Sequence, residues 1–299
     1  PVVVQVVNKA NRTPATRKLL EGVLKIHKDR QLPEYDSKKF RSTIQPSAQW
    51  PVRDGKNTPG KAAIYATCYV NYNEPGIGHD LVKILRHNEI PHTLVEKEAC
   101  CGMPKLELGD LDGVKALKEK NIPHLAKLAK QGYAILTAVP SCTLMYKSEL
   151  PLMFSDDADV KAVAEAMFDP FEYFMLRNAD GLLKTDFKKP LGKVSYHIPC
   201  HLRVQNLGQK TREMLQLVPN TMVNTVERCS GHDGTWGVKT EYFDMSMKIG
   251  KPVFKAMANT EPDYVSSDCA IAGRHILQGM GTQTEKQHPL TLIRIAYGL

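Results

Sequence analysis

The sequence predicts an α/β fold made of two similar parallel-sheet units, related by an internal duplication with a pseudo-twofold arrangement. Three observations predict it. Six short apolar segments each lead into a cysteine. The cysteines after these segments are spaced alike in the two halves of the chain, 32 and 42 residues apart in the first and 29 and 40 in the second. Segments of helical length separate them, and strands that alternate with helices form parallel sheets with right-handed crossovers.

Strands of a parallel sheet are covered on both faces, so they are expected to be apolar throughout rather than alternating. The predicted strands, each with its cysteine, are 61–67 and Cys68, 93–96 and Cys100, 134–139 and Cys142, 193–198 and Cys200, 222–226 and Cys229, and 264–267 and Cys269. The predicted helices are 78–87, 114–131, 211–217, 246–257 and 271–279. We therefore expect one unit at 61–189 and a second at 190–299.

Residues 1–60 are expected to hold an N-terminal helix and a linker. Thr13 followed by Pro14 is a typical helix start. Apolar residues follow at helical spacing over 19–24, and basic residues, Arg17 among them, occupy the other side. We expect this apolar stripe to pack on the body of the protein, and a basic helix on a membrane surface is the alternative. Residues 31–60 are polar and rich in Pro and Gly, as linkers are.

The composition is that of a globular chain, with 42% hydrophobic and 24% charged residues among 299. No apolar run reaches the about 18 residues of a membrane span. The chain opens at Pro1 without a signal peptide, so we expect a processed or truncated piece. The net charge of +8 suits an anionic membrane face or an acidic partner. Because no nucleic-acid-binding motif accompanies it, we expect no nucleic-acid partner.

The cysteines point to a metal or redox site. Seven is an odd number and too few for a disulfide scaffold in a chain of this length, which favours a reduced cytoplasmic compartment. In an open parallel sheet, functional groups gather beyond the carboxyl ends of the strands. Six cysteines stand just there and the seventh is adjacent to one of them. Cysteines that served only as small core residues would be scattered over strands and helices.

The first unit offers four thiolates, from Cys68, Cys100, Cys101 and Cys142. Four is the number that an iron–sulfur cluster or a tetrahedral zinc ion requires. Adjacent cysteines diverge, which suits a cluster whose thiolates bind different irons better than a single zinc ion. Gly102 after the pair permits a positive φ and lets backbone N–H groups approach sulfur.

The second unit offers three thiolates, from Cys200, Cys229 and Cys269, and Ser230 stands where the first unit has its adjacent cysteine. A fourth donor has to come from another group, and His201 and His232 are the candidate histidine ligands. Zinc held by three cysteines and a histidine is one interpretation. A cluster with an exchangeable iron site is another.

At these residues the sequence resembles the family of proteins with two cysteine-rich CCG domains, found in heterodisulfide reductase, in the iron–sulfur component of glycolate oxidase and in lactate-utilisation proteins. The resemblance is carried by TCYVNYNEPGIGHD from Thr67, EKEACCGMP from Glu96, SCTLMYKSELP from Ser141, YHIPCHLR from Tyr196, CSGHDGTWGVKTE from Cys229, SDCAIAGRHI from Ser267 and QHPLTLI from Gln287. It makes 61–189 the first CCG domain and 190–299 the second.

The resemblance implies an iron–sulfur electron-transfer protein or a subunit of an oxidoreductase in anaerobic respiration, whose seven cysteines match the family's ligand positions. It implies a cluster, of the 4Fe-4S type, in the first domain and a second cluster or zinc in the second. Electrons would come from a flavin-containing dehydrogenase and pass toward quinone. A ferredoxin-like domain or subunit is a further implied partner, and the implied location is cytoplasmic, peripheral on the inner membrane face.

Two departures from the family's pattern bear on the chemistry. Met145 and Ala272 stand where the full motif of heterodisulfide reductase has its final cysteines, which argues against that enzyme's noncubane clusters and disulfide chemistry. Ser230 replaces a cysteine of the second motif. The ferredoxin-like domain that such proteins usually carry is also not found in this sequence.

Two other functions stay open at this stage. One is a catalytic thiol, disulfide or quinone reductase at the second site, with Arg203, Arg274 or His275 holding an anionic substrate or quinone. The other is a non-enzymatic scaffold with structural zinc. No catalytic residue is identified, and haem is a further cofactor option, with His79, His197 and His275 as axial ligands.

Overall fold

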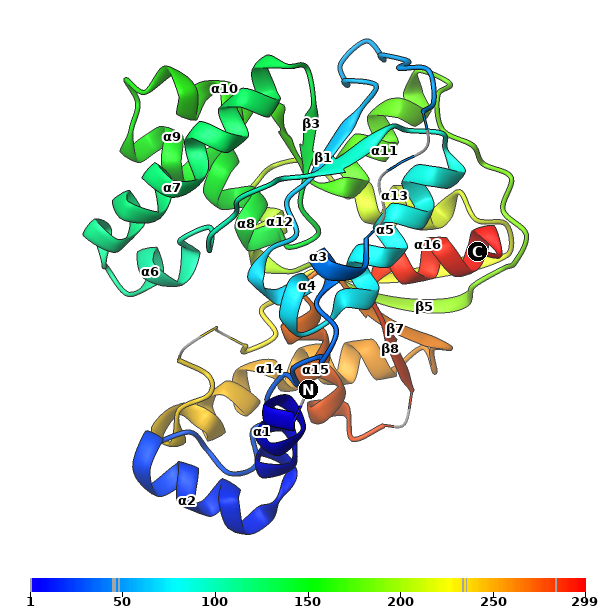
Figure 1. The fold of residues 1–299 in the computed structure, drawn as a ribbon. Coiled ribbons are helices and arrows are strands. Elements are labelled where there is room, and N and C mark those ends of the chain that lie inside the picture. The colour runs from blue at the N-terminus through cyan, green and yellow to red at the C-terminus, as the bar shows by residue number, and fades with distance from the viewer. Residues whose placement is uncertain (1, 45–46, 48, 233, 235, 283) are drawn as a thin grey trace.

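The computed structural model describes residues 2–44, 47, 49–232, 234, 236–282 and 284–299. Within them it contains two four-stranded sheets whose strands are all parallel. The first consists of β1 (Ala62–Ile64), β2 (His92–Leu94), β3 (Ala134–Leu136) and β4 (Met167–Phe168). The second consists of β5 (Gly192–His197), β6 (Thr221–Val226), β7 (Tyr264–Ser267) and β8 (Glu285–Gln287). Figure 1 shows the two sheets with helices packed around them.

The two sheets have the same topology. The first has the strand order β2-β1-β3-β4 and the second β6-β5-β7-β8, so each strand of one sheet has its counterpart in the other. The predicted fold, two duplicated α/β units with parallel sheets, is therefore confirmed. The third crossover of each unit, to β4 and to β8, was not predicted, because no cysteine follows these two strands and the cysteines marked the other six.

Helices connect the strands on both sides of each sheet. In the first unit they are α4 (Cys68–Tyr72), α5 (Pro75–His87), α6 (Met103–Glu107), α7 (Leu111–Lys130), α8 (Pro140–Leu144), α9 (Leu150–Met153), α10 (Ala158–Ala166) and α11 (Pro170–Ala179), with a π-helical turn, η1 (Met145–Glu149), after α8. In the second unit they are α12 (Cys200–Arg203), α13 (Lys210–Gln216), α14 (Phe243–Ala258), α15 (Ala270–Met280) and α16 (Pro289–Tyr297), with a 3₁₀ turn, η2 (Thr240–Tyr242), before α14.

The two units pack against each other through reciprocal helix pairs. The helix after the last strand of each unit packs on the helix near the start of the other, so α16 contacts α5 and α11 contacts α13. One buried cluster of hydrophobic side chains runs through this interface, with Leu85 and Phe174 from the first unit and Tyr196 and Leu292 from the second. The apolar core is thus shared, as in a pseudo-dimer with twofold character.

The two interface helices begin in equivalent ways. Asp169 caps α11 and accepts hydrogen bonds from the backbone N–H groups of Phe171 (2.8 Å) and Glu172 (3.3 Å). His288 caps α16, and its Nδ1 accepts from the N–H of Leu290 at 3.2 Å. Both caps precede a proline at the first helical position, where the missing N–H has no cost. The segment QHPLTLI from Gln287 is therefore the start of α16, the helix that packs on the first unit.

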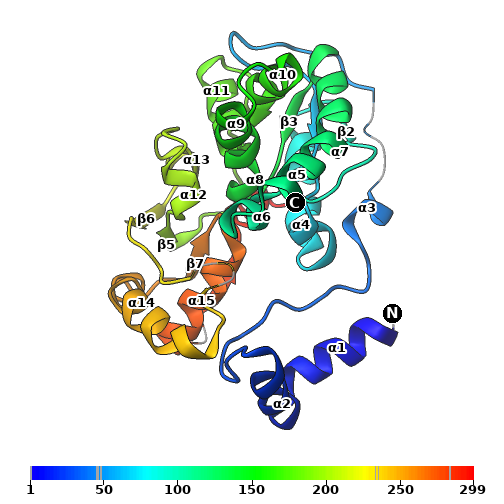
Figure 2. The ribbon, with the colours of Figure 1, turned by 90° about the vertical axis from the view of Figure 1, so that its left-hand side faces the viewer.

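The N-terminal segment forms α1 (Val2–Arg12), α2 (Pro14–Leu24) and α3 (Phe40–Thr43). Figure 2 shows α1 and α2 apart from both sheets, at the lower end of the molecule. The segment is joined to the second unit by backbone hydrogen bonds, since the His27 N–H donates to the carbonyl of Val238 at 3.0 Å and the Thr240 N–H to that of Lys25 at 2.8 Å. The His27 ring also stacks on Phe243, with ring centroids 3.8 Å apart.

The predicted packing of α2 on the body of the protein is wrong in its orientation. Leu19, Val23 and Leu24 are 65%, 69% and 50% exposed, whereas Arg17 on the opposite side is buried. The reason is a set of backbone acceptors. The Arg17 guanidinium donates to the carbonyls of His27 (2.6 Å), Lys28 (3.0 Å) and Arg30 (2.9 Å), which fixes the polar side of α2 toward the following loop.

None of the described helices is both long enough and apolar enough to cross a bilayer.

The shared core predicts that the two units unfold together. Leu292 is fully buried on α16 against α5, so Leu292→Ala should lower the free energy of unfolding by about 2–5 kcal/mol. The change should appear as one shifted transition in chemical denaturation. Leu152→Ala, at a position 79% exposed, is the control and should change stability by less than about 0.5 kcal/mol. Two separate transitions, with only one shifted, would contradict a common core.

Candidate metal centres

Strand register brings the cysteines of each unit to one edge. Ile64 of β1 pairs with Leu94 of β2 and with Leu136 of β3, and a cysteine follows each strand within a few residues. His197 of β5 pairs in the same way with Val226 of β6 and Ser267 of β7. The carboxyl ends of parallel strands share an edge of the sheet, so segments distant in sequence meet there.

The four thiols of the first unit contact one another. Sulfur hydrogen bonds join Cys68 to Cys100, Cys100 to Cys101, and Cys101 to Cys142. Cys68 is exposed, Cys100 is half-buried, and Cys101 and Cys142 are buried, so the group extends from the surface into the core. The structure thus assembles the first predicted set of ligands.

Within this group the pKa of the Cys100 thiol is shifted in the opposite direction to the pKa values of Cys68 and Cys101. The Cys100 sulfur accepts hydrogen bonds from Cys101 and Cys68 and from the N–H of Gly102, which lowers the pKa of the Cys100 thiol. Hydrogen bonding to Cys100 and burial raise the pKa of Cys68, and hydrogen bonds to Cys100 and Cys142 raise that of Cys101. The opposite directions of these pKa shifts follow from thiols that lie close together and interact with one another.

The surroundings of these thiols suit an iron–sulfur cluster. Gly102 has the predicted positive φ, 101°, and its N–H points to sulfur, the kind of contact that tunes a cluster. No set of three or more His, Cys, Asp or Glu side chains among the described residues converges on the position of a single metal ion. A polynuclear cluster does not need such convergence, because each thiolate binds a different iron.

Polar side chains that the sequence analysis did not identify hold the Ala99–Cys100 loop. Asn121 on α7 is buried; its Oδ1 accepts from the N–H of Ala99 at 2.8 Å and its Nδ2 donates to the carbonyl of Cys100 at 3.0 Å. The hydroxyl of Tyr65 donates to the carbonyl of Ala99, and the hydroxyl of Tyr146 donates to that of Tyr65 at 3.2 Å. Such contacts come from residues far apart in sequence, so no local motif signals them.

A buried carboxylate lies beside the first site. Glu98 accepts a hydrogen bond from the N–H of Ala66 at 2.8 Å and pairs with Arg41 of the N-terminal segment at 3.2 Å. Burial raises the pKa of Glu98 to about 7, against the opposing effect of Arg41. The Arg41 Nη2 also donates to the carbonyl of Glu96 at 2.6 Å, so the segment before the first unit braces the loop that carries the cysteine pair.

The second unit brings its three thiols together less tightly. Cys200 and Cys229 are exposed and Cys269 is half-buried. Burial raises the pKa of Cys200 and of Cys269, and each is raised further by a neighbouring thiolate, Cys229 for the first and Cys200 for the second. The N–H of Gly231 donates to the Cys229 sulfur at 3.4 Å, as the corresponding glycine does in the first unit.

The loop of Cys229 is held by an arginine of the N-terminal segment. Arg30 is buried and donates from Nη2 to the Ser246 hydroxyl (2.8 Å) and to the carbonyl of Gly237. The Ser246 hydroxyl donates in turn to the carbonyl of Gly231 at 2.6 Å. Gly231 is required here, since its φ is 77° and a Cβ would lie 2.2 Å from the Ser246 carbonyl oxygen.

The two histidines proposed as fourth ligands have neighbours of their own. The His201 Nε2 is 3.7 Å from a carboxylate oxygen of Glu107. The rings of His232 and His275 have centroids 5.9 Å apart, and the N–H of His232 donates to the Ser230 hydroxyl at 3.4 Å. Neither histidine is shown beside the three thiols, so both stay predictions as ligands.

The histidines proposed as haem ligands also contact protein groups. His79 contacts the Thr43 hydroxyl at 3.0 Å, and His197 contacts the Ser267 hydroxyl at 3.2 Å and the Arg228 carbonyl at 2.9 Å. His275 contacts the Arg30 guanidinium. These contacts occupy both ring nitrogens of His197, and the haem option gains no support from them.

The two sites face each other across the interface. Helix α12, which begins at Cys200, packs on α8, which contains Cys142. The Gln205 side chain donates to the carbonyl of Pro140 at 3.1 Å, and His201 approaches Glu107 from the other unit. Both sites are therefore adjacent to the same interface, as electron transfer between them would require.

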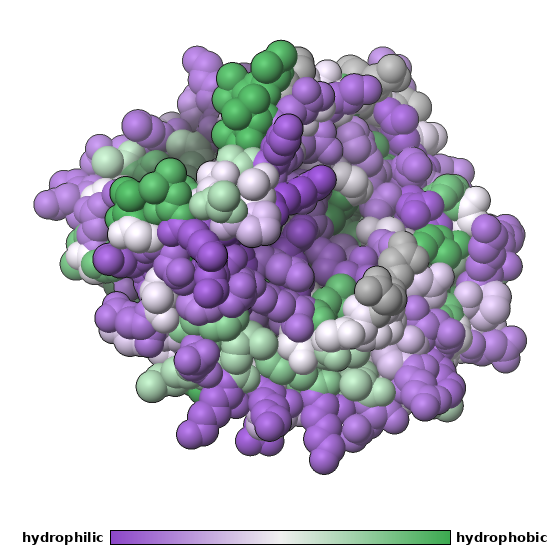
Figure 3. Space-filling model, turned by 90° about the horizontal axis from the view of Figure 1, so that it is seen from below, coloured by the Kyte–Doolittle hydropathy of each residue, from purple (hydrophilic) through white to green (hydrophobic). Residues whose placement is uncertain are grey.

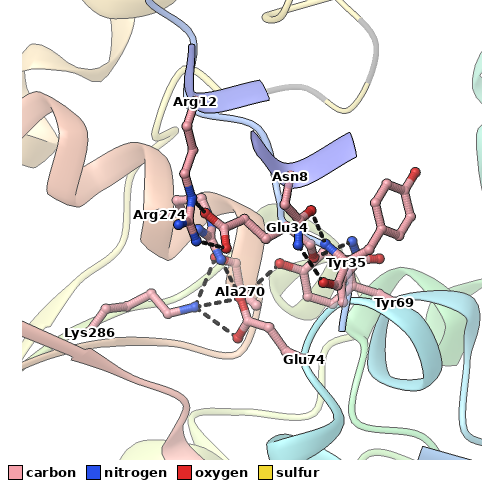
Figure 4. A network of polar contacts seen from close by, with 10 residues as sticks. Asn8, Arg12, Glu34, Tyr35, Tyr69, Glu74, Ala270, Arg274 and Lys286 are labelled. Carbon is pink, nitrogen blue, oxygen red and sulfur yellow. Dashed lines mark hydrogen bonds and ion pairs between the residues drawn. The ribbon is translucent and has the colours of Figure 1, made fainter. Parts of the chain in front are cut away.

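A half-buried ionic network joins the two units (Figure 4), and Lys286 of this network interacts electrostatically with Cys269. Glu74 of the first unit accepts from Lys286 at 3.0 Å on both oxygens, from Arg274 at 3.0 Å and from the Tyr69 hydroxyl at 2.9 Å. The two cations come from the second unit. Despite burial, they lower the pKa of Glu74, whereas burial lowers that of Lys286. Arg274, a candidate for binding an anionic substrate, thus has an ion-pair partner.

Comparisons with known proteins relate the chain to iron–sulfur proteins. The cysteine-rich domain family CCG matches residues 62–147 and 194–273. One component of the anaerobic glycerol-3-phosphate dehydrogenase of Escherichia coli (strain K12) is 30% identical over 295 residues, which cover 96% of this chain and 71% of that protein. One component of the fumarate reductase (CoM/CoB) of Methanothermobacter marburgensis is 26% identical over 254 residues, 81% of this chain and 48% of the relative. An uncharacterized iron–sulfur protein of Methanocaldococcus jannaschii is 27% identical over 219 residues, which cover 72% of this chain and 41% of that protein.

The network around Glu74 predicts a coupled loss of stability. Glu74→Gln leaves the half-buried Lys286 without a carboxylate partner, so we expect the free energy of unfolding, measured by chemical denaturation at pH 7, to fall by about 1–3 kcal/mol. In a Lys286→Met background, Glu74→Gln should lower the free energy of unfolding by clearly less. The pKa of Glu74 is lower in the folded state than in the unfolded state. Its contribution to the free energy of unfolding is therefore present above the pKa of the unfolded state and is lost as the pH falls through the pKa of the folded state. Equal costs in both backgrounds would exclude a coupled network.

Proposed function

This chain belongs to the cysteine-rich CCG domain family, and on this basis we propose that it is an iron–sulfur electron-transfer subunit of an oxidoreductase. The observation that carries the proposal is the contact among Cys68, Cys100, Cys101 and Cys142 at one sheet edge. The relatives agree with it, since their names describe a dehydrogenase subunit, a reductase subunit and an iron–sulfur protein.

The first site would hold its cluster by these four thiolates. A bound iron–sulfur cluster of the 4Fe-4S type supplies one-electron transfer. The chain's own contribution is to bury the side of the site formed by Cys101 and Cys142 and to polarise the thiolates. Tyr65, Tyr146 and Met145 are buried around the thiols and exclude water, and the Gly102 N–H stabilises negative charge on the Cys100 sulfur. Burial and hydrogen bonds to sulfur set the reduction potential of such a cluster.

The second site would hold a further cluster or a zinc ion through Cys200, Cys229 and Cys269. Three thiolates leave one position for another donor, and His201 and His232 are the side chains we propose for it. The exposed thiols of Cys200 and Cys229 are also compatible with a second function, a reductase in which this site binds a thiol, disulfide or quinone. Single-turnover reduction assays with Cys229→Ser separate that enzyme from a pure carrier.

We propose a flavin-containing dehydrogenase as the electron donor, a ferredoxin-like domain or subunit as an intermediate carrier, and quinone as the acceptor. The name of the Escherichia coli relative, which is part of a dehydrogenase, supports a dehydrogenase partner. We also propose a peripheral position on the cytoplasmic face of a membrane. Exposed apolar side chains on α1 and α2, including Val3, Leu19 and Val23, support it, because they lie beside lysines in a chain of net charge +8. Figure 3 shows apolar patches on this face within a mostly hydrophilic surface.

The cluster assignment is tested by Cys101→Ala in protein prepared anaerobically. The variant removes one buried ligand of the first site, so iron and sulfide content should fall and the EPR spectrum of the reduced protein should change. Far-UV circular dichroism should stay near that of the wild type. Cys229→Ala is the matched variant for the second site and should change a different signal, and the exposed Ser155→Ala should change neither. Unchanged iron content and EPR in Cys101→Ala would refute the assignment.

A further inference from the structure

A cavity of about 560 Å³ lies between the hairpin of α1 and α2 and helix α15. It is separate from both cysteine sites, since none of the described residues that line it is a cysteine. Six of its lining side chains are basic, namely Arg12, Arg17, Lys18, Lys28, Arg30 and Arg274, and two are acidic, Asp29 and Glu34. Three of these residues, Arg12, Glu34 and Arg274, lie close together in Figure 4. This excess of positive charge is concentrated in one concave site.

Arg17 is the central observation. Its side chain is 4% exposed, and its three hydrogen bonds go to neutral backbone carbonyls. Among the described residues no carboxylate lies within 4.0 Å of its guanidinium, and its Nη1 is buried without a hydrogen-bond partner. Glu21 and Asp29 act on it only as more distant charges. A buried cation without an anionic partner is unfavourable, so this geometry favours an anion that completes it.

Two more guanidinium groups on the same cavity have nitrogens without a partner. The Nε atoms of Arg30 and Arg274 are both buried and lack an acceptor within the described part of the chain. Arg30 is 3% exposed and contacts only neutral groups, the His275 ring, the Ser246 hydroxyl and the Gly237 carbonyl. Three arginines from separate segments therefore line one cavity, and each has one buried guanidinium nitrogen without an acceptor. Arg274 is also paired with Glu74, so within the described residues Arg17 and Arg30 are the two of these arginines without a carboxylate partner.

We propose that this cavity binds a phosphate group. A phosphate offers several oxygen acceptors in a tetrahedral arrangement, which matches guanidinium donors that come from three arginines. The nearby carboxylates do not prevent it. Glu34 is already neutralised by Arg12, whose guanidinium donates to both of its oxygens, and Asp29 is an exposed residue. The volume also leaves room for an organic remainder on the phosphate.

This site is independent of the proposed electron-transfer function, although it adjoins the second metal site. Arg30 connects the two, because it lines the cavity and also holds Ser246, which bonds the loop of Cys229. A phosphate group on Arg30 would therefore stabilise that loop. The site can be tested whether or not the protein carries metal.

The test is isothermal titration calorimetry of the full chain with inorganic phosphate at constant ionic strength. The wild type should bind one phosphate per chain, and Arg17→Gln should weaken binding by about tenfold or more, since it removes a charged donor. Arg17 also holds the loop after α2 by hydrogen bonds, so its substitution changes local structure as well as charge. A second variant that leaves this loop intact is therefore needed. Lys28→Glu changes an exposed residue at the cavity and should weaken binding several-fold, whereas Lys120→Glu, an exposed position on α7, should leave it unchanged. No saturable binding by the wild type, or equal losses in Lys28→Glu and Lys120→Glu, would overturn the proposal.

A second arm identifies the source of the phosphate group. Phosphatidylcholine vesicles with and without phosphatidic acid are sedimented with the protein. Binding to phosphatidic acid that inorganic phosphate displaces, and that Lys28→Glu loses, assigns the site to a lipid headgroup. Calorimetric binding of inorganic phosphate without such competition assigns it to a free phosphate or phosphate ester. Both results support a phosphate site. The proposal is refuted if inorganic phosphate does not displace the protein from the vesicles and calorimetry detects no binding of inorganic phosphate.

Discussion

The parallel register of short strands is the constraint on which the rest of the molecule depends. Because neighbouring strands run in the same direction, their carboxyl ends meet at one edge, and whatever residues follow them are brought together. In the first unit this joins Cys68, the Cys100–Cys101 pair and Cys142, which are separated by up to 74 residues in the sequence. The second unit repeats the arrangement with one cysteine fewer.

The interface between the units then places the two edges near each other. Reciprocal helix pairs bury a common hydrophobic core, and the short helices that start or contain the cysteines, α8 and α12, pack together. The ionic network of Glu74, Arg274 and Lys286 fixes the same interface. Such ion pairs add little net stability but specify one arrangement of the groups that they join. Here that arrangement sets the relation between the two sites.

Much of the fold followed from the sequence because its signal is local. Apolar runs ending at cysteine predicted β1 and its counterparts, and segments of helical length between them predicted α5, α7 and α14. Strands β4 and β8 were not recognised because no cysteine follows them. The burial of Arg17 reversed the expected orientation of α2, because three carbonyls of a later loop outweigh the apolar stripe. Asn121, Glu74 and Arg30 act on segments remote in sequence, so only the tertiary structure reveals them.

The central claim is that the thiols gathered at the sheet edges hold iron and sulfide. It is tested most directly by chemical analysis of iron, acid-labile sulfide and zinc in the wild-type protein, purified under anaerobic conditions, together with its visible absorption spectrum. The account predicts a brown protein with iron and sulfide in equal amounts, at least about four of each per chain. A colourless protein that contains zinc and no iron would contradict it.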